Sequence, residues 1–252
     1  MFLLAIDQGN TRTKFGIYST GTLCKSWVSA TNKTASADDL AHTIFNTATE
    51  IQECEIGLCT VVPELLPQWQ QMAYTYNIPL TCITGLTPTP LRNAYETPET
   101  LGPDRLMAAV AAENLVGSPV IVLSLGTATV VDAVSRDATF LGGMIAPGIG
   151  TMARALTARA SALQSVKWQR PTAAIARSST QAMMSGLFYQ SVGGIQNMVH
   201  VVRKELGIEA PIAITGGWAS SIAPYLDCVA LTDELLVLHG IALTLQQQNN
   251  SH

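Results

Sequence analysis

Short apolar runs alternate with segments of helical periodicity along the first third of the chain, and this alternation is typical of an α/β fold. The runs predicted as strands are residues 2–7 (FLLAID), 14–19 (KFGIYS), 55–63 (EIGLCTVVP) and 79–85 (PLTCITG). The segments predicted as helices are residues 36–51, which begin with a serine and two aspartates, and residues 63–76. The first two strands flank a Gly-Asn pair, which tolerates positive φ, so we expect them to form a hairpin.

A long proline-containing segment follows these elements. Residues 86–105 contain four prolines, which predicts an irregular connection because proline suits neither a helix interior nor a central strand. An apolar helix is predicted over residues 105–116, and the Gly-Ser-Pro triplet at 117–119 ends it. We therefore expect two domains, at residues 1–117 and 118–252.

The second half opens with a pattern that matches the start of the chain. In AIDQGNTRTKFGIY and VLSLGTATVVDAV, Asp7 falls opposite Ser124, Gly9 opposite Gly126, and Asn10 opposite Thr127. The elements predicted after this hairpin are a glycine-rich strand and helix at 142–160, a long helix at 178–206, a strand and Gly-Gly turn at 211–226, and a helix at 234–252. The repeat suggests two copies of one unit facing each other across a cleft. The alternative is that any two α/β hairpins look this similar.

Composition narrows the possible functions. Hydrophobic residues make up 48% of the chain and charged residues 13%, which is typical of a globular protein. The formal net charge of −4 leaves no basic face for a nucleic-acid backbone, so we expect no nucleic-acid partner. No apolar run reaches the roughly 18 residues of a membrane-spanning helix, and Asp7 interrupts the N-terminal run, so we expect no membrane partner and a cytoplasmic protein. Five scattered cysteines predict reduced thiols, and four dispersed histidines offer no metal-ligand spacing.

The first hairpin carries residues suited to phosphate binding. Gly9 allows a ligand to approach the backbone closely, Asn10 and Thr11 supply donors, and Lys14 adds a positive charge. Asp7 would repel a bare phosphate, so its expected role is to hold a hydrated Mg²⁺ that bridges the phosphates. The alternative is an ordinary Gly-Asn hairpin without a ligand, and the chain has neither a Walker motif nor a dinucleotide fingerprint.

The second hairpin offers Gly126, Thr127 and Thr129, so the two hairpins together could clamp a polyphosphate. Glycine-rich turns at 142–148 and 214–219 could receive a ribose and base, although packing against a helix explains them equally well.

Further candidates lie where the proline-containing connection enters the next helix: Tyr95, Gly102, Asp104 and Arg105. Asp104 could accept a hydroxyl proton and Arg105 could hold an anionic substrate, two roles that phosphoryl transfer requires. The alternative for Asp104 is a helix cap.

Taken in order, these motifs resemble the type III pantothenate kinases, a family of the actin-like and sugar-kinase-like ATPases. DQGNTRTK resembles the first phosphate motif, YETPETLGPDR the pantothenate-binding segment, SLGTAT the second phosphate motif, and GGMIAPG and SSTQAMMSG later motifs. The resemblance covers nearly the whole chain. It implies two duplicated ribonuclease H-like domains around a central cleft, and phosphorylation of pantothenate by ATP to 4′-phosphopantothenate, the first step of coenzyme A biosynthesis.

The resemblance also implies roles for individual residues. Those that would bind ATP phosphates and Mg²⁺ are Asp7, Gln8, Gly9, Asn10, Thr11, Arg12, Thr13 and Lys14, with Thr127 contacting ATP from the second half. Those that would hold pantothenate are Tyr95, Gly102, Pro103, Asp104, Arg105 and Thr180, the last across a dimer interface. Asp104 would be the catalytic base, and Pro103 stands where the family usually has a small residue such as alanine. Small residues along 178–206 also suit a homodimer contact.

Ser124 departs from the family pattern. The family usually has an aspartate before its second phosphate motif and binds a monovalent cation such as K⁺ or NH₄⁺. A serine hydroxyl can coordinate such a cation but brings no charge. We therefore expect a weaker dependence on potassium than the family pattern implies.

Two other functions compete with a kinase. One is a nucleotide-binding regulatory or accessory protein in which Ser124 marks a degenerate site. The presence of Asp7, Lys14, Asp104 and Arg105 together weighs against it, because a binding module does not need the Asp-Arg pair. The other is a phosphatase of the same fold that acts on polyphosphate. A phosphatase would have no evident need for the segment that contains Tyr95 and Asp104.

Overall fold

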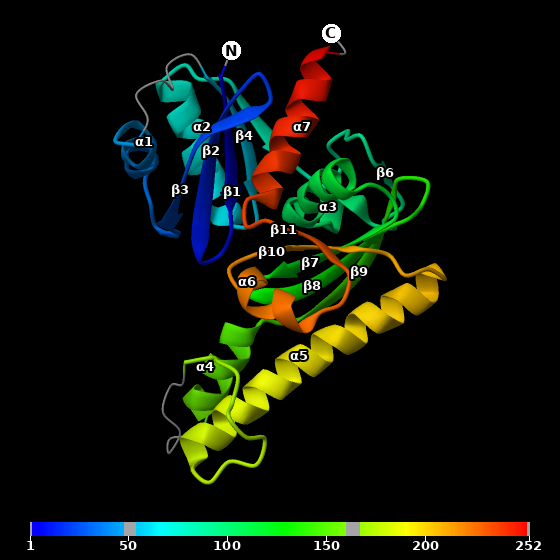
Figure 1. Cartoon of the computed structure of the whole chain (residues 1–252). Coiled ribbons are helices and arrows are strands. Elements are labelled where there is room, and N and C mark those ends of the chain that lie inside the picture. The colour runs from blue at the N-terminus through cyan, green and yellow to red at the C-terminus, as the bar shows by residue number, and fades with distance from the viewer. Residues whose placement is uncertain (1, 48–53, 160–166, 251–252) are drawn as a thin grey trace. The chain divides into compact units, whose positions relative to one another are not determined.

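The computed structural model of the chain describes residues 2–47, 54–159 and 167–250 (Figure 1). The chain divides into two compact units, one formed by residues 1–114 and 235–252 and the other by residues 115–234. The first division lies close to the predicted boundary at 117. The predicted second domain was wrong at its end, because the C-terminal helix belongs to the first unit.

The first unit is a mixed sheet with helices on both faces. Its elements are β1 (Phe2–Gln8), β2 (Arg12–Ser19), β3 (Thr22–Ala30), α1 (Ala37–Phe45), β4 (Cys54–Thr60), η2 (Pro63–Leu65), α2 (Leu66–Thr75), β5 (Leu80–Ile83), β6 (Arg92–Asn93), η3 (Pro98–Thr100), most of α3 (Pro103–Val116), and α7 (Leu236–Asn250). The strand order is β3-β2-β1-β4-β5, with β1 antiparallel to β2 and parallel to β4. The part of the predicted helix 36–51 that covers residues 48–51 lies outside the described residues.

Strand alternation divides the apolar residues of β1 between two layers. Leu4 and Ile6 face α1 and α2, in a core that includes the fully buried Trp69. The other face is covered by α7, which packs on β1, β2 and β4. Gly57 allows this close approach, because a Cβ at this position would lie 2.5 Å from Cδ1 of Leu245.

The turns of this sheet differ from the sequence prediction in one respect. Neither Gly9 nor Asn10 has a positive φ in the turn between β1 and β2. Positive φ occurs in the next turn, at Thr20 (47°) and Gly21 (83°), which leads into β3. The sequence analysis missed β3, because its exposed and half-buried residues give no apolar run.

The second unit repeats the topology of the first. Its elements are β7 (Val120–Leu125), β8 (Ala128–Val134), β9 (Thr139–Pro147), α4 (Ile149–Arg159), α5 (Ser179–Leu206), β10 (Ile212–Thr215), α6 (Ala219–Ile222), η4 (Ala223–Tyr225) and β11 (Val229–Thr232). Its strands run β9-β8-β7-β10-β11, and each adjacent pair has the same relative direction as its counterpart in the order β3-β2-β1-β4-β5. The predicted duplication is therefore confirmed.

A long helix, α5, covers one face of the second sheet. Phe188, Val192 and Ile195 pack into the core that surrounds β7 and β10. The Ser178 hydroxyl accepts a hydrogen bond from the amide of Gln181 at the start of the helix, and Gly207, with φ of 66°, ends it. Across the described ranges of the chain, no helix combines the length and apolarity that a membrane crossing needs.

Candidate functional site

Asp7, Lys14 and Cys59 form a row across the centre of the first sheet. Asp7 pairs directly with Lys14 on the antiparallel strand β2 and with Cys59 on the parallel strand β4. Residues paired in this way place their side chains on the same face of a sheet. The row therefore brings a carboxyl, an ammonium and a thiol together beside the turn after β1. The sequence analysis missed Cys59, because only the pairing of β1 with β4 places it there.

Burial raises the pKa of Asp7 to about 7, while Lys14 acts to lower it and Asp104 raises it further. Burial likewise raises the pKa of the Cys59 thiol, with smaller contributions from the carboxyls of Asp7 and Asp104. These interactions place Asp104 near the row, although it is 97 residues from Asp7 in the chain. Two carboxyls that share one site resist simultaneous ionisation, so this site is poised to take up a cation.

The raised pKa of Asp7 predicts a pH dependence of stability. Because the folded protein holds this proton more tightly than the unfolded chain, the contribution is fully present below about pH 4 and is lost as the pH rises towards 7. Asp7→Asn mimics the neutral form at every pH. We expect the variant to gain stability relative to the parent between pH 5 and pH 8, by roughly 1–4 kcal/mol. Urea unfolding of both proteins at several pH values measures this difference, and a constant difference would contradict the assignment.

The start of α3 positions Asp104. Pro103 is the first helical residue, where its missing amide hydrogen costs nothing, and Asp104 follows it. The Asp104 Oδ1 atom accepts a hydrogen bond of 3.0 Å from the amide of Arg105. Asp104 therefore lies within the first turn of α3 and not at the N-cap position of the capping alternative, and its charge also acts on Asp7. Gly102 leaves room for this carboxylate, because a Cβ there would lie 2.7 Å from its Oδ1 atom.

Arg105 and Tyr95 form a second pair at this end of α3. The Arg105 Nη1 atom donates to the Tyr95 hydroxyl oxygen at 3.3 Å, and the guanidinium carbon lies 5.4 Å from the centre of the ring. Arg105 is buried, with 7% of its surface exposed, while Tyr95 is half-buried. The structure thus joins two residues that were assigned to one substrate, Tyr95 from the middle of the proline-containing segment and Arg105 from its end.

The turn after β1 is held by one local hydrogen bond and by two from the segment that follows β3. The Gly9 amide donates to the Arg12 carbonyl at 3.0 Å, and the Thr31 hydroxyl donates to the Gly9 carbonyl at 2.7 Å. Asn10 accepts a 2.8 Å hydrogen bond from Lys33. Thr11 and Arg12 are exposed, and Arg12 lies on the same strand face as Lys14 by alternation.

Gln8 and Thr13 differ from the other residues predicted to bind phosphate. They pair with each other one position beyond Asp7 and Lys14, so their side chains lie on the opposite face of the sheet. The Gln8 Oε1 atom accepts hydrogen bonds from the Thr60 hydroxyl at 2.8 Å and the Trp69 indole at 3.1 Å. Any contact that these two residues make with a phosphate on the Asp7 face must therefore come from their backbone.

The second unit has its own cluster of small and hydroxyl residues. Ser124 is the counterpart of Asp7 and pairs with Thr215 on β10, as Asp7 pairs with Cys59 on β4. The exposed Thr127 accepts hydrogen bonds at its carbonyl from the Gly148 amide at 3.0 Å and the Thr151 hydroxyl at 2.7 Å. These contacts bring the second hairpin and the turn at Gly148 together. Gly148 is required here, because a Cβ would lie 2.3 Å from the Gly126 carbonyl oxygen.

Thr180 belongs to the second unit. It is exposed in the first turn of α5, two residues after the cap Ser178. The start of α5 lies beside α4 (Figure 1).

The residues present fit Mg²⁺ better than they fit the monovalent cation that the family resemblance implies. Among the described residues, no group of three or more His, Cys, Asp or Glu side chains could hold a metal directly. The Asp7 carboxylate, with Asp104 nearby, fits a hydrated Mg²⁺ that ATP phosphates also bind. At the monovalent-cation position, Ser124 and Thr215 offer hydroxyl oxygens without a carboxylate. Thr215 Oγ1 is buried and has no partner in the described part of the chain.

The duplicated sheets of this topology, with a carboxylate and a lysine beside the first hairpin, give the chain the actin-like ATPase fold. An inorganic polyphosphate/ATP-glucomannokinase from Arthrobacter sp. has this fold, with a TM-score of 0.53 at 14% identity over 98% of this chain and 99% of its own. A Campylobacter jejuni protein assigned to the Baf family of transcriptional activators matches with a TM-score of 0.65 at 20% identity, over 98% and 99% of the two chains. At these identities the likeness concerns the fold alone.

Sequence comparison gives the family. The family profile described as type III pantothenate kinase matches residues 3–201. A type III pantothenate kinase from Roseiflexus sp. is 35% identical over 257 residues, which cover 99% of this chain and all of the relative. The chain belongs to the type III pantothenate kinase family.

Proposed function

We propose that the protein transfers the γ-phosphate of ATP to the primary hydroxyl of pantothenate, with Asp104 as the base. The observation that carries this proposal is that Asp104, at the start of α3, is close enough to Asp7 for its charge to raise the pKa of that carboxyl. In this arrangement the Asp104 carboxylate serves the attacking hydroxyl, and the Asp7 carboxylate serves the phosphate end of ATP. Family membership supports the two substrates, and the product is 4′-phosphopantothenate.

Asp104 suits the role of base by its position. Its Oδ1 atom is held by the amide of Arg105, so the carboxylate has one fixed orientation at the start of α3. In the proposed reaction the substrate hydroxyl attacks the γ-phosphorus, its proton passes to Asp104, and ADP leaves. The reaction needs little covalent assistance, because phosphoryl transfer depends mainly on positioning and on charge stabilisation.

Arg105 and Tyr95 are assigned to pantothenate. A buried guanidinium is a strong partner for a carboxylate, and pantothenate carries one. The Tyr95 ring and hydroxyl support Arg105, so we assign the pair, together with Gly102 and Pro103, to substrate binding. Thr180 and the homodimer also belong to this proposal, because Thr180 would reach pantothenate from a second copy. The small residues of α5 support a contact between copies.

The hairpin from Asp7 to Lys14 is assigned to ATP. Mg²⁺, when bound, neutralises phosphate charge and polarises the γ-phosphoryl group. Asp7 would hold the hydrated ion, Lys14 would contact phosphate oxygens, and Thr127 would contact ATP from the second unit. We also propose that the protein works in the cytoplasm, as a metabolic kinase without a membrane partner.

Potassium dependence follows from Ser124. With only the hydroxyls of Ser124 and Thr215 at this position, we expect potassium to raise kcat/KM by less than about threefold over sodium, because neither oxygen carries charge. Ser124→Asp should increase that ratio. Initial rates in matched sodium, potassium and ammonium chloride measure it. Strong activation of the parent protein by potassium would contradict this assignment.

Product analysis tests the proposed function directly. The protein is incubated with ATP, Mg²⁺ and pantothenate, and the mixture is analysed for phosphopantothenate and ADP in equal amounts. ADP and phosphate formed without pantothenate would indicate a phosphatase instead. Binding of ATP without any product would favour the regulatory or accessory protein, and both results would overturn the proposal.

A further inference from the structure

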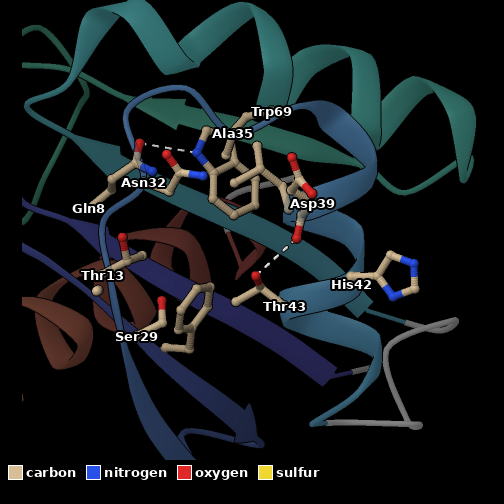
Figure 2. A pocket seen from close by; sticks show the side chains of 12 residues that line it. Gln8, Thr13, Ser29, Asn32, Ala35, Asp39, His42, Thr43 and Trp69 are labelled. Carbon is tan, nitrogen blue, oxygen red and sulfur yellow. Dashed lines mark hydrogen bonds between the residues drawn. The ribbon is translucent and has the colours of Figure 1, made fainter.

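The first unit has a pocket on the face of its sheet opposite to Asp7. The pocket has a volume of about 260 Å³ and lies between β1, β2, β3, α1 and α2 (Figure 2). Its inner wall is made of the buried side chains of Gln8, Thr13, Phe15 and Trp69. Strand alternation separates it from the candidate active site, because Gln8 and Asp7 are neighbours on β1 that point in opposite directions.

Two amide groups in the pocket have fixed orientations. The Gln8 Oε1 atom accepts from the Trp69 indole and the Thr60 hydroxyl, and the Asn32 Oδ1 atom accepts from the Thr34 amide at 3.1 Å and its hydroxyl at 2.9 Å. Because these donors identify the oxygen atoms, the other terminal atom of each side chain is an NH₂ group.

These NH₂ groups are available to a ligand. Neither has a hydrogen-bond acceptor among the residues that the structure describes. Gln8 is only 1% exposed, so its donors are buried at the inner end of the pocket. Asn32 is exposed, and in the described part of the chain no buried, unpaired polar atom belongs to Gln8, so both NH₂ groups can be reached from the pocket, where a carbonyl oxygen of a ligand would replace water as their acceptor. Ser29 adds a hydroxyl on the same wall.

The charges around the pocket exclude two classes of ligand. Among the described residues that line it there is no lysine or arginine, and the Asp39 carboxylate stands at its rim, so an anion would be repelled. Contacts from the Ser36 backbone and hydroxyl hold the pKa of Asp39 below its usual value, so this carboxylate is ionised at neutral pH. His42 is also at the rim, but its ring turns away from the pocket (Figure 2). A cation inside the pocket would face the hydrogens of the two NH₂ groups, which offer it no acceptor.

We propose that this pocket binds a small uncharged molecule with a carbonyl-type acceptor and a flat apolar part. The acceptor would meet the NH₂ groups of Gln8 and Asn32, and the apolar part would lie against Phe15 and Trp69. The volume accommodates about 10–15 non-hydrogen atoms, which is below the usual size of a drug-like ligand site.

Benzamide is a suitable probe, because benzoate and benzylamine have nearly the same shape with opposite charges. Ligand-observed NMR titration of the full chain is expected to give a millimolar Kd for benzamide, on the order expected for nine non-hydrogen atoms. Benzoate and benzylamine should bind about tenfold more weakly or not at all. Saturating Mg²⁺, ATP and pantothenate should not displace benzamide.

Two variants of β3 provide a matched comparison. Ser29→Leu fills the pocket from its wall, whereas Ser26→Leu makes the same change at an exposed position on the other face of the strand. We expect benzamide affinity to fall at least about tenfold in Ser29→Leu and to stay within about twofold in Ser26→Leu. Asn32→Asp keeps the acceptor for Thr34, removes one NH₂ group, and should weaken binding several-fold.

Three results would overturn the proposal. They are the absence of benzamide binding up to its solubility limit, equal affinity for benzoate, and unchanged affinity in Ser29→Leu that folds as the parent does. Displacement of benzamide by the substrates would place it in the candidate active site instead and would overturn the claim of a separate site.

Discussion

Replacing Asp104 with asparagine is expected to lower kcat for pantothenate phosphorylation by about 10²–10⁴-fold, the usual contribution of a positioned base. Asparagine retains an oxygen that can accept the Arg105 amide hydrogen bond, so α3 should begin as in the parent. It cannot accept the substrate proton at neutral pH. The KM for ATP should change little, because Asp104 is assigned to the hydroxyl rather than to the nucleotide. Steady-state kinetics with both substrates measure these constants.

A stability measurement separates this effect from misfolding. Because Asp104 raises the pKa of Asp7, loss of its charge should leave the protein as stable as the parent or more so. Asp227→Asn makes the same chemical change at an exposed residue of the second unit and should have normal kinetics. Near-normal turnover of the Asp104 variant would show that another group, or solvent, accepts the proton.

Replacing Asp7 with asparagine is expected to reduce kcat/KM for MgATP by about 10²–10³-fold, because it removes the only carboxylate assigned to the hydrated metal. Binding of MgATP to the parent should also release a proton near neutral pH. The reason is that the pKa of Asp7 is about 7 without a cation and should fall when Mg²⁺ and Lys14 face the ionised carboxylate. Calorimetric titration in buffers with different ionisation enthalpies measures the number of protons released.

The same titration should show no proton release in Asp7→Asn. Asp38→Asn, an exposed carboxylate in the first turn of α1, is the matched control and should release protons as the parent does. Equal MgATP affinity in the parent and in Asp7→Asn would exclude Asp7 from the metal site.

Much of the fold could be predicted because local patterns agree with the final structure. The apolar runs became β1, β2, β4, β5 and β7, and the helix signals at Ser36 and Ser178 mark the true starts of α1 and α5. The match between the hairpins at Asp7 and Ser124 predicted the duplication, and strand pairing places these two residues at equivalent positions.

What the sequence could not provide was the face on which each side chain lies. Gln8 and Thr13 belong to the same motif as Asp7 and Lys14, yet the pleat of β1 and β2 turns them towards Trp69 and a separate pocket. The return of α7 to the first unit depends on contacts such as Leu245 against Gly57, which are remote in sequence. Cys59 shares the site with Asp7 only because β4 pairs in parallel with β1.

A crystal structure with a non-hydrolysable ATP analogue, Mg²⁺ and pantothenate tests the account most directly. If Asp104 is the base, one of its carboxylate oxygens should lie within about 2.6–3.2 Å of the primary hydroxyl of pantothenate, with that hydroxyl directed at the γ-phosphorus. Pantothenate bound with its hydroxyl away from Asp104, or a γ-phosphate away from the turn after Asp7, would contradict it.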